Sequence, residues 1–332
     1  MRAISPSNLE KELRANAKAD IPSMIWGPPG SGKSQIVYQL AKGMNAKLFE
    51  LRANLFDPVD VRGGLKVVEQ ENGTYKTRYG IPEDYPDADY DGLVMLFIDE
   101  LSNAPKATQN ALLQLTLDKK IGTYHLPART IIIAAGNRQQ DRAAVHEMPT
   151  PVKNRFSHFE LETNIDDWCP WAYRNNVDPS IISFLRYRPA LLHNVDSTQN
   201  AFPSPRAWEM LNRKLKHLSD EFYGCASLVG DGAAGEYIAF KSIYKELPDI
   251  DDLIDKPSTT PVPTGPSVLY AIAGAITSRV TETNFEPVMR YTKRMPAEYQ
   301  VIVIRDSIAK EPNLLNHDAF KAWTKDNASV LL

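Results

Sequence analysis

The chain has 332 residues, of which 43% are hydrophobic and 24% charged, and its formal net charge is −3. This composition excludes a disordered or fibrous protein, and the length predicts two compact units. The near balance of charges gives no global electrostatic reason to bind nucleic acid or a membrane. The cysteines, Cys169 and Cys225, are far apart and lack a C-x-x-C pairing, which argues against a disulfide framework or a zinc site and favours a reducing compartment.

The first part of the chain, to about residue 163, predicts an α/β unit. A short polar helix is expected from Ser7, with no apolar segment typical of a secretion signal. Short apolar runs then alternate with helical segments, which predicts a parallel sheet covered by helices. The runs typical of strands are Ser23–Trp26, Lys47–Leu51, Leu93–Ile98, Thr130–Ala135 and Ser157–Leu161.

Residues 164–332 predict a helical unit, because strand signals largely stop after Asn164. A proline-rich stretch at 256–266 is expected to be an extended connector, since proline suits neither a helix interior nor a central strand. The most hydrophobic stretch, Val268–Ile276, is far shorter than the ~20 residues of a membrane span, so we expect a cytoplasmic protein. The predicted helices are Asp166–Asn175, Asp178–Tyr187, Pro205–Leu218, Glu236–Lys245, Ser267–Val280 and Glu298–Lys310.

A complete G-x-x-x-x-G-K-[ST] pattern follows the first predicted strand of the sheet and precedes a helical segment. In such a loop, glycines let backbone N–H groups turn toward phosphate oxygens, the lysine reaches the β- and γ-phosphates, and the hydroxyl binds Mg²⁺. The helix dipole also favours the negative phosphates. The pattern therefore predicts a nucleoside triphosphate site with Mg²⁺, formed by Gly27, Pro28, Pro29, Gly30, Ser31, Gly32, Lys33 and Ser34.

The run at residues 93–98 ends in two acids, Asp99 and Glu100. A buried parallel strand places such residues at its carboxyl end. This is a Walker B pattern, in which Asp99 is expected to hold Mg²⁺ and Glu100 to polarise the attacking water. An acidic exposed loop is expected just upstream, at Glu83–Asp91.

From Asp99 onward the sequence resembles the MoxR-like AAA+ ATPases, and the match spans nearly the whole chain. The resemblance lies in DELSNAPKATQNALLQLTLDKKIG, in IIIAAGN, in PTPVKNRFSHFEL and in FPSPRAWEML, which keep the motif order of the family. It implies an AAA+ core with a parallel sheet, followed by an all-helical lid domain at 164–332.

The resemblance also implies three further site residues. Asn137 ends its strand where the family has a residue that senses the γ-phosphate. Arg155 occupies the position of an arginine finger that reaches the neighbouring subunit's nucleotide, with Arg142 as an alternative and a surface ion pair as the competing interpretation. Arg206, after Ser204 and Pro205, fits the second sensor, which contacts the γ-phosphate from the lid of the same chain.

Family members carry hairpin inserts, and Asn72-Gly73 predicts a two-residue hairpin turn within Leu65–Tyr79. The insert is placed near 63–80, and a second short hairpin is expected around Lys119–Leu126. In ring assemblies such inserts face the central pore or the partner. The sequence also allows a plain exposed hairpin.

The resemblance implies an ATPase that forms a homo-oligomer, typically a hexameric ring, and remodels a protein client. Family clients often contain a von Willebrand factor A domain. The absence of an N-K-x-D motif favours ATP over GTP. The alternative is a nucleic-acid motor or loader, since the insert holds Lys66, Lys76 and Arg78. Neighbouring glutamates offset these charges and no reading module is evident, so nucleic acid is the less expected partner. A non-hydrolysing scaffold is disfavoured by Glu100.

Overall fold

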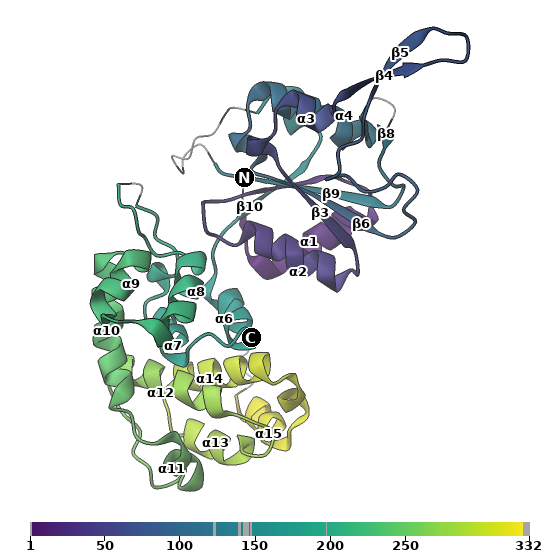
Figure 1. Ribbon diagram of the computed structural model, residues 1–332. Coiled ribbons are helices and arrows are strands. Elements are labelled where there is room, and N and C mark those ends of the chain that lie inside the picture. The colour runs from purple at the N-terminus through teal and green to yellow at the C-terminus, as the bar shows by residue number, and fades with distance from the viewer. Residues whose placement is uncertain are drawn as a thin grey trace. The chain divides into compact units, whose positions relative to one another are not determined.

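The computed structural model describes residues 2–121, 124–138, 141, 146, 148–196 and 198–327. The chain divides into two compact units, Met1–Thr163 and Asn164–Leu332. Figure 1 shows a sheet with helices in the first unit and helices in the second. Among the described residues, no helix has both the length and the apolar character needed to cross a membrane.

A sheet of six strands forms the centre of the first unit, in the order β1-β10-β2-β9-β6-β3. All neighbouring strands are parallel, so their carboxyl ends lie along one edge. The central strands β6 and β9 are almost entirely buried, as expected where helices cover both faces of a parallel sheet. The predicted α/β class is confirmed. The strands are β1 (Ala3–Ile4), β2 (Ser23–Trp26), β3 (Lys47–Arg52), β6 (Val94–Asp99), β9 (Thr130–Gly136) and β10 (Ser157–Leu161).

Helices cover the two faces of this sheet (Figure 1). On one face, α1 (Pro6–Lys18) and α2 (Lys33–Gly43) pack their apolar residues on the sheet. The other face is covered by α3 (Pro58–Arg62), α4 (Lys106–Asp118) and α5 (Thr150–Lys153). Alternate side chains of each buried strand therefore enter one of two apolar cores.

Two hairpins extend the first unit. The longer one pairs β4 (Leu65–Glu69) with β5 (Tyr75–Tyr79). Its turn differs from the predicted two-residue type: Gln70 N still donates to Thr74 O at 2.7 Å, which leaves a three-residue loop, and Gly73 supplies its positive φ of 75°. The shorter hairpin pairs β7 (Lys120–Ile121) with β8 (Tyr124–His125).

The described residues of the second unit contain helices and no strands. Several helices begin at a capping side chain: Asn164 accepts from Asp166 N, and Ser204 Oγ accepts from Ala207 N. Residues 256–265 contain neither helix nor strand. The helices are α6 (Ile165–Arg174), α7 (Pro179–Tyr187), α8 (Pro205–Lys214), α9 (Glu221–Val229), α10 (Asp231–Lys245), α11 (Ile250–Asp255), α12 (Pro266–Arg279), α13 (Phe285–Thr292), α14 (Ala297–Lys310) and α15 (Asp318–Asp326).

The helical unit has two apolar cores, one around α7, α8 and α10 and the other around α12, α13 and α14. A buried ion pair lies between α7 and α14. Arg186 Nη2 pairs with Asp306 Oδ1, and the two side chains are only 5% and 1% exposed. Because each charge is removed from water, each depends on the other for compensation.

Candidate nucleotide-binding site

The glycine-rich loop joins β2 to α2 at the carboxyl edge of the sheet. Two of its glycines have conformations that L side chains rarely adopt: φ is 76° at Gly30 and 95° at Gly32, which is the N-cap of α2. A Cβ at Gly27 would lie 3.2 Å from Ser31 Oγ and 3.4 Å from Leu161 O. The loop therefore needs glycine for two reasons, backbone conformation and close packing.

Lys33, the first residue of α2, points back over the loop and is buried. Its Nζ donates to Gly27 O at 2.7 Å and to Pro28 O at 3.1 Å. It also donates to Asn137 Oδ1 at 3.0 Å, which joins the loop to the end of β9. An ammonium group is thus held where the loop, α2 and β9 meet.

Ser34 and Asp99 are brought together from α2 and β6. Ser34 Oγ donates to Asp99 Oδ2 at 2.8 Å. The other carboxylate oxygen, Asp99 Oδ1, accepts from Glu100 N at 2.8 Å. Glu100 has a φ of 55°, an uncommon conformation for a residue other than glycine. Sequence reasoning selected all three residues, and Asp99 joins the other two through its carboxylate oxygens.

Asn137 is held by a neighbour that sequence reasoning did not select. Ser102 Oγ accepts from Asn137 N at 2.9 Å and donates to Asn137 O at 3.1 Å. Asn137 Nδ2 lies 3.4 Å from Asn103 Oδ1. The amide oxygen of Asn137 is thereby directed toward Lys33 and its NH₂ group toward Asn103. Ser102 lies two positions after Glu100, the second acid of the Walker B pattern. This position was its only sequence signal.

Arg138, which follows Asn137, is held by two acidic side chains. Arg138 Nη2 pairs with Asp141 Oδ1 at 2.7 Å, and Arg138 Nη1 pairs with Glu160 Oε1 of β10 at 2.5 Å. The hydrogen bond to Asp141 is the main cause that raises the pKa of Arg138. The guanidinium therefore stays charged and ties the end of β9 to β10.

A second polar link ties α2 to β3. Tyr38 Oη donates to Glu50 Oε2 at 2.7 Å, and burial together with the Glu50 carboxylate raises the pKa of Tyr38 to about 12. Tyr38 therefore remains a neutral donor at ordinary pH. This holds the helix that carries Lys33 and Ser34 against the sheet.

The loop suits a phosphate chain, and one orphaned atom supports this fit. Ser31 Oγ is buried in the loop and is among the side-chain atoms without a hydrogen-bond partner in the described part of the chain. The N-terminus of α2 also carries no acidic residue in its first turn, so its dipole favours an anion. Among the described residues there is no group of three or more His, Cys, Asp or Glu side chains suited to a metal ion. Mg²⁺ can instead be held by the Ser34 and Asp99 oxygens together with phosphate oxygens and water, as is usual for this ion.

The three predicted arginines are placed differently. Arg155 lies in the first unit, just after α5, and its N–H donates to Val152 O at 3.2 Å. Arg142 lies outside the described residues. Arg206 is in the first turn of α8, in the other unit.

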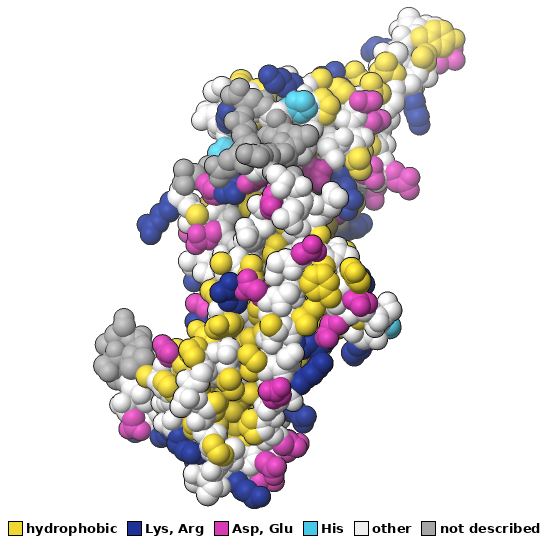
Figure 2. Space-filling view, turned by 90° about the vertical axis from the view of Figure 1, so that its left-hand side faces the viewer, with side chains coloured by type: hydrophobic (Ala, Val, Ile, Leu, Met, Phe, Trp, Pro, Cys, Tyr) yellow, Lys and Arg dark blue, Asp and Glu magenta, His cyan; other side chains and the backbone are white. Residues whose placement is uncertain are grey.

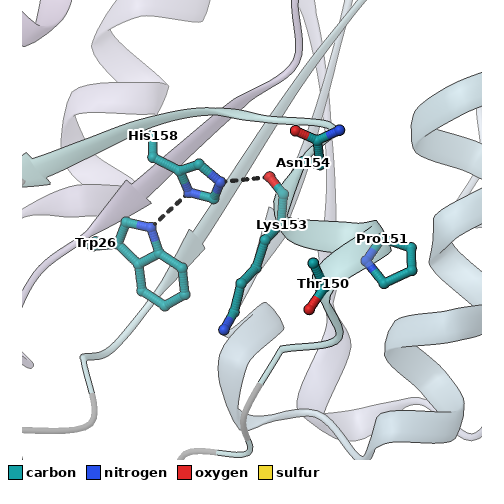
Figure 3. Close-up of a pocket in the computed structure, with 6 residues that line it drawn as sticks. All are labelled: Trp26, Thr150, Pro151, Lys153, Asn154 and His158. Carbon is teal, nitrogen blue, oxygen red and sulfur yellow. Dashed lines mark hydrogen bonds between the residues drawn. The ribbon is translucent and has the colours of Figure 1, made fainter.

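An open pocket of about 710 Å³ lies beside the loop, on the face of the sheet that α5 covers. Figure 3 shows Trp26 and His158 side by side on one flank of it, and Lys153 beside them. The two rings lie edge to edge and nearly in one plane, with centroids 6.0 Å apart and planes at 19°. Sequence reasoning selected neither ring as a site residue. Trp26 directly precedes Gly27, but its pairing with a residue 132 positions away has no local sequence signal. The pocket is lined by Trp26, Thr150, Pro151, Lys153, Asn154 and His158.

Comparisons with known proteins give one match by sequence family and several by structure. Residues 13–148 match a family model described as the MoxR domain in the MoxR-vWA-beta-propeller ternary systems. NtrX from Brucella abortus in complex with ATP is 14% identical, with 98% of this chain and 68% of that chain covered and a TM-score of 0.40. The RuvB Holliday junction branch migration motor of Thermotoga maritima is 16% identical, with 85% and 86% covered and a TM-score of 0.38. TM-scores of this size carry no weight for function. No curated protein sequence matches.

Proposed function

Because this chain belongs to the MoxR-like AAA+ ATPases through residues 13–148, we propose that it hydrolyses ATP in an oligomeric ring and uses the energy to remodel a partner protein. The observation that carries the proposal is the cluster at the carboxyl edge of the sheet. Lys33 Nζ donates to Asn137 Oδ1 at 3.0 Å, and the next residue, Ser34, donates from Oγ to Asp99 Oδ2 at 2.8 Å. These are the groups that phosphoryl transfer needs close together.

The roles follow from the chemistry of each group. The loop from Gly27 to Ser34 binds the phosphates through its N–H groups, and Lys33 neutralises the β- and γ-phosphates. Ser34 and Asp99 hold Mg²⁺, which when bound offsets the negative charge that develops on the phosphate oxygens. Glu100 orients and polarises the attacking water. Asn137 contacts the γ-phosphate through its amide.

Binding requires an exchange of partners at Lys33. Its Nζ donates to two loop carbonyls and to Asn137, and the same ammonium must reach the phosphates. We infer that ATP replaces the carbonyls of Gly27 and Pro28 as acceptors, while Asn137 stays beside the terminal phosphate. A charged acceptor is a stronger partner than a carbonyl, so the exchange is favourable.

Two arginines complete the proposed site. Arg155 reaches the nucleotide of the adjacent subunit, where its guanidinium stabilises charge in the transition state. This makes hydrolysis depend on assembly, and a homo-oligomeric, hexameric ring is the expected state. Arg206 acts from the helical lid of the same chain. Ser204 and Pro205 at the start of α8 support this role, because they set the first turn from which Arg206 projects.

The partner is proposed to be a protein with a von Willebrand factor A domain. The matching family model is named for systems that contain such a domain. The β4–β5 hairpin offers a surface for it. Strand pairing places Leu65, Val67, Tyr75 and Tyr79 on one face, together with Thr77 opposite Val67 and Glu69 opposite Tyr75. Leu65, Val67 and Tyr75 are 65 to 68% exposed, and an apolar face this open suits a protein partner. Figure 2 shows hydrophobic side chains on this projecting hairpin.

A second function, that of a nucleic-acid motor, is favoured by the opposite face of the same hairpin. There Lys66 pairs with Arg78, and Val68 pairs with Lys76. Three cations on one face could contact a phosphate backbone, and such binding weakens steeply with salt. We rank it second because the apolar face has no role in phosphate contact. The two cysteines are buried and unpaired, which is compatible with the cytoplasmic location that we propose.

The experiment that tests the proposed function combines an ATPase assay with calorimetry of ATP–Mg²⁺ binding. The wild type is expected to turn over ATP, Lys33→Ala to lose binding, and Glu100→Gln to bind ATP with nearly no turnover. Glu71→Gln, on the exposed hairpin loop, is the matched control and should behave as the wild type. Absence of ATP binding by the wild type would overturn the proposal. So would normal turnover by Lys33→Ala or Glu100→Gln.

A further inference from the structure

His158 forms hydrogen bonds from both ring nitrogens, on two sides (Figure 3). Its Nδ1 accepts from Trp26 Nε1 at 2.9 Å. Its Nε2 lies 2.7 Å from Lys153 O. The side chain thus joins the last residue of β2 to the last residue of α5.

One protonation state satisfies both contacts. The indole of Trp26 is only a donor, so Nδ1 of His158 must accept. The carbonyl of Lys153 is only an acceptor, so Nε2 must carry the hydrogen. The ring is therefore the neutral tautomer with its hydrogen on Nε2, and its plane lies at only 19° to that of the Trp26 indole. A side chain held at both ring nitrogens acts as a rigid spacer.

The Trp26 end of this spacer is joined to the nucleotide loop. Trp26 directly precedes Gly27, whose N–H donates to Gly136 O at 3.2 Å and whose carbonyl accepts from Lys33 Nζ at 2.7 Å. The position of the Trp26 indole is therefore set by the same loop that cradles the phosphates. No residue lies between Trp26 and the first residue of the loop.

The Lys153 end is joined to Arg155. Lys153 is the last residue of the four-residue helix α5, and its carbonyl accepts from Phe156 N at 3.4 Å. Arg155 lies between these two residues, in the turn that this carbonyl closes. A helix of one turn has little stability of its own, so a 2.7 Å hydrogen bond to its last carbonyl strongly influences where the turn lies.

We propose that His158 is a positioning residue that holds the Arg155 segment at a set distance from the nucleotide loop of the same subunit. This rests on the proposed function, in which Arg155 serves the neighbour's nucleotide. His158 touches neither nucleotide. At each interface His158 acts in the subunit that supplies Arg155. Its loss therefore harms hydrolysis in the adjacent subunit and leaves ATP binding in its own subunit intact.

The test uses mixed rings in which only one kind of site can work. Arg155→Ala subunits keep a hydrolytic site but supply no arginine, and Glu100→Gln subunits supply the arginine but cannot hydrolyse. A mixture of the two is expected to recover ATPase activity that neither has alone. His158→Phe, which keeps an aromatic ring without either hydrogen bond, is then placed in one subunit type at a time.

The expected result is asymmetric. In the Glu100→Gln donor, His158→Phe lowers the recovered activity roughly ten- to a hundredfold, the range expected when a catalytic group is displaced by about 1 Å. In the Arg155→Ala recipient, the same change leaves the recovered activity within about twofold of that of the mixture with His158 intact. A merely misfolded subunit would fail in both placements, so the asymmetry separates positioning from a loss of stability. ATP affinity of the His158→Phe chain alone, measured by calorimetry, should equal that of the wild type.

Two further donor variants sharpen the result. Trp26→Phe keeps a ring but removes the indole N–H, and it should reproduce the donor defect. His158→Gln retains one acceptor and one donor, and it should restore part of the activity. If a donor with His158→Phe recovers as much activity as a donor with His158 intact, the positioning role is wrong while the proposed function stands. If the mixture without any change at His158 recovers nothing, the role of Arg155 in trans is wrong and the positioning role falls with it.

Discussion

Ser102 holds Asn137 by its main chain: Ser102 Oγ accepts from Asn137 N at 2.9 Å and donates to Asn137 O at 3.1 Å. The same hydroxyl belongs to the 3₁₀ turn that follows Glu100. A single side chain therefore joins the segment of the proposed catalytic acid to the residue proposed to sense the γ-phosphate. The two are held at one separation before nucleotide arrives.

Ser102→Ala should lower kcat with little effect on ATP affinity. The substitution removes both contacts to Asn137 but leaves the phosphate loop untouched, and a lost hydrogen bond of ~1 kcal/mol corresponds to about a fivefold loss of rate. Steady-state kinetics and calorimetry on the same preparation separate the two quantities. Ser227→Ala, at an exposed position of α9, is the matched control. A change confined to KM would contradict the role given to Ser102.

Gly136→Ala should destabilise the α/β unit and impair turnover. A Cβ at Gly136 would lie 2.6 Å from Ser102 Oγ and 2.8 Å from Met24 Cε, so the Ser102 contact must shift. Overpacking of this kind costs about 1–3 kcal/mol. Denaturant unfolding measures the cost.

The control for Gly136 is Gly235→Ala in α10, where a Cβ meets nothing within 4 Å. Because alanine favours a helix over glycine, this variant should be more stable by about 0.5–1 kcal/mol. If Gly136→Ala proved as stable as the wild type, the close packing at the end of β9 would not constrain this position.

The strands of the sheet could be predicted because each is a short apolar run beside a turn or helix signal. Five such runs match strands to within about one residue at each end. The strand β1 was not predicted, because two residues, Ala3 and Ile4, carry no pattern. Helix α13 was also missed. It has eight residues, with Pro287 inside it, so a local reading finds little helical signal.

The residues of the loop could likewise be selected from spacing, because phosphate binding demands particular residue types at particular positions. The contacts that hold the residues around the loop in place could not be predicted in this way. Ser102 and Asn137 are 35 positions apart, and Trp26 and His158 are 132 apart. Such contacts depend on strand order, and no pattern in a single sequence states that β10 lies beside β2.

The buried pair Arg186–Asp306 provides a test in the helical unit. Asp306→Ala should destabilise this unit by about 3–5 kcal/mol, because it leaves a buried guanidinium without its partner. Asp166, which also pairs with Arg186, is half exposed and cannot replace the lost charge fully. Chemical denaturation followed by circular dichroism measures the change.

The control for Asp306 is Glu209→Ala, which removes an exposed ion pair with Arg213 whose atoms are 3.9 Å apart. Its effect should stay below about 0.5 kcal/mol. Similar losses for both variants would mean that the Arg186 charge is compensated in another way.

The two faces of the β4–β5 hairpin distinguish a protein client from nucleic acid. Val67→Ser with Tyr75→Ser removes the main apolar contacts of one face, and Lys66→Ser with Lys76→Ser removes two cations of the other. All four side chains are exposed, so each double variant should change the free energy of unfolding by at most about 0.5 kcal/mol per site and leave basal ATPase activity unchanged. Any difference between the two variants therefore reports on the partner.

For a protein client, the apolar-face variant should weaken binding of a von Willebrand factor A domain protein by tenfold or more, since exposed aromatic and aliphatic anchors carry much of such binding energy. Fluorescence anisotropy with the labelled domain measures this. The basic-face variant should bind it nearly as well. If instead duplex DNA stimulates the ATPase, and the basic-face variant loses both this stimulation and its steep salt dependence, the nucleic-acid motor becomes the better assignment and the protein-client proposal is wrong.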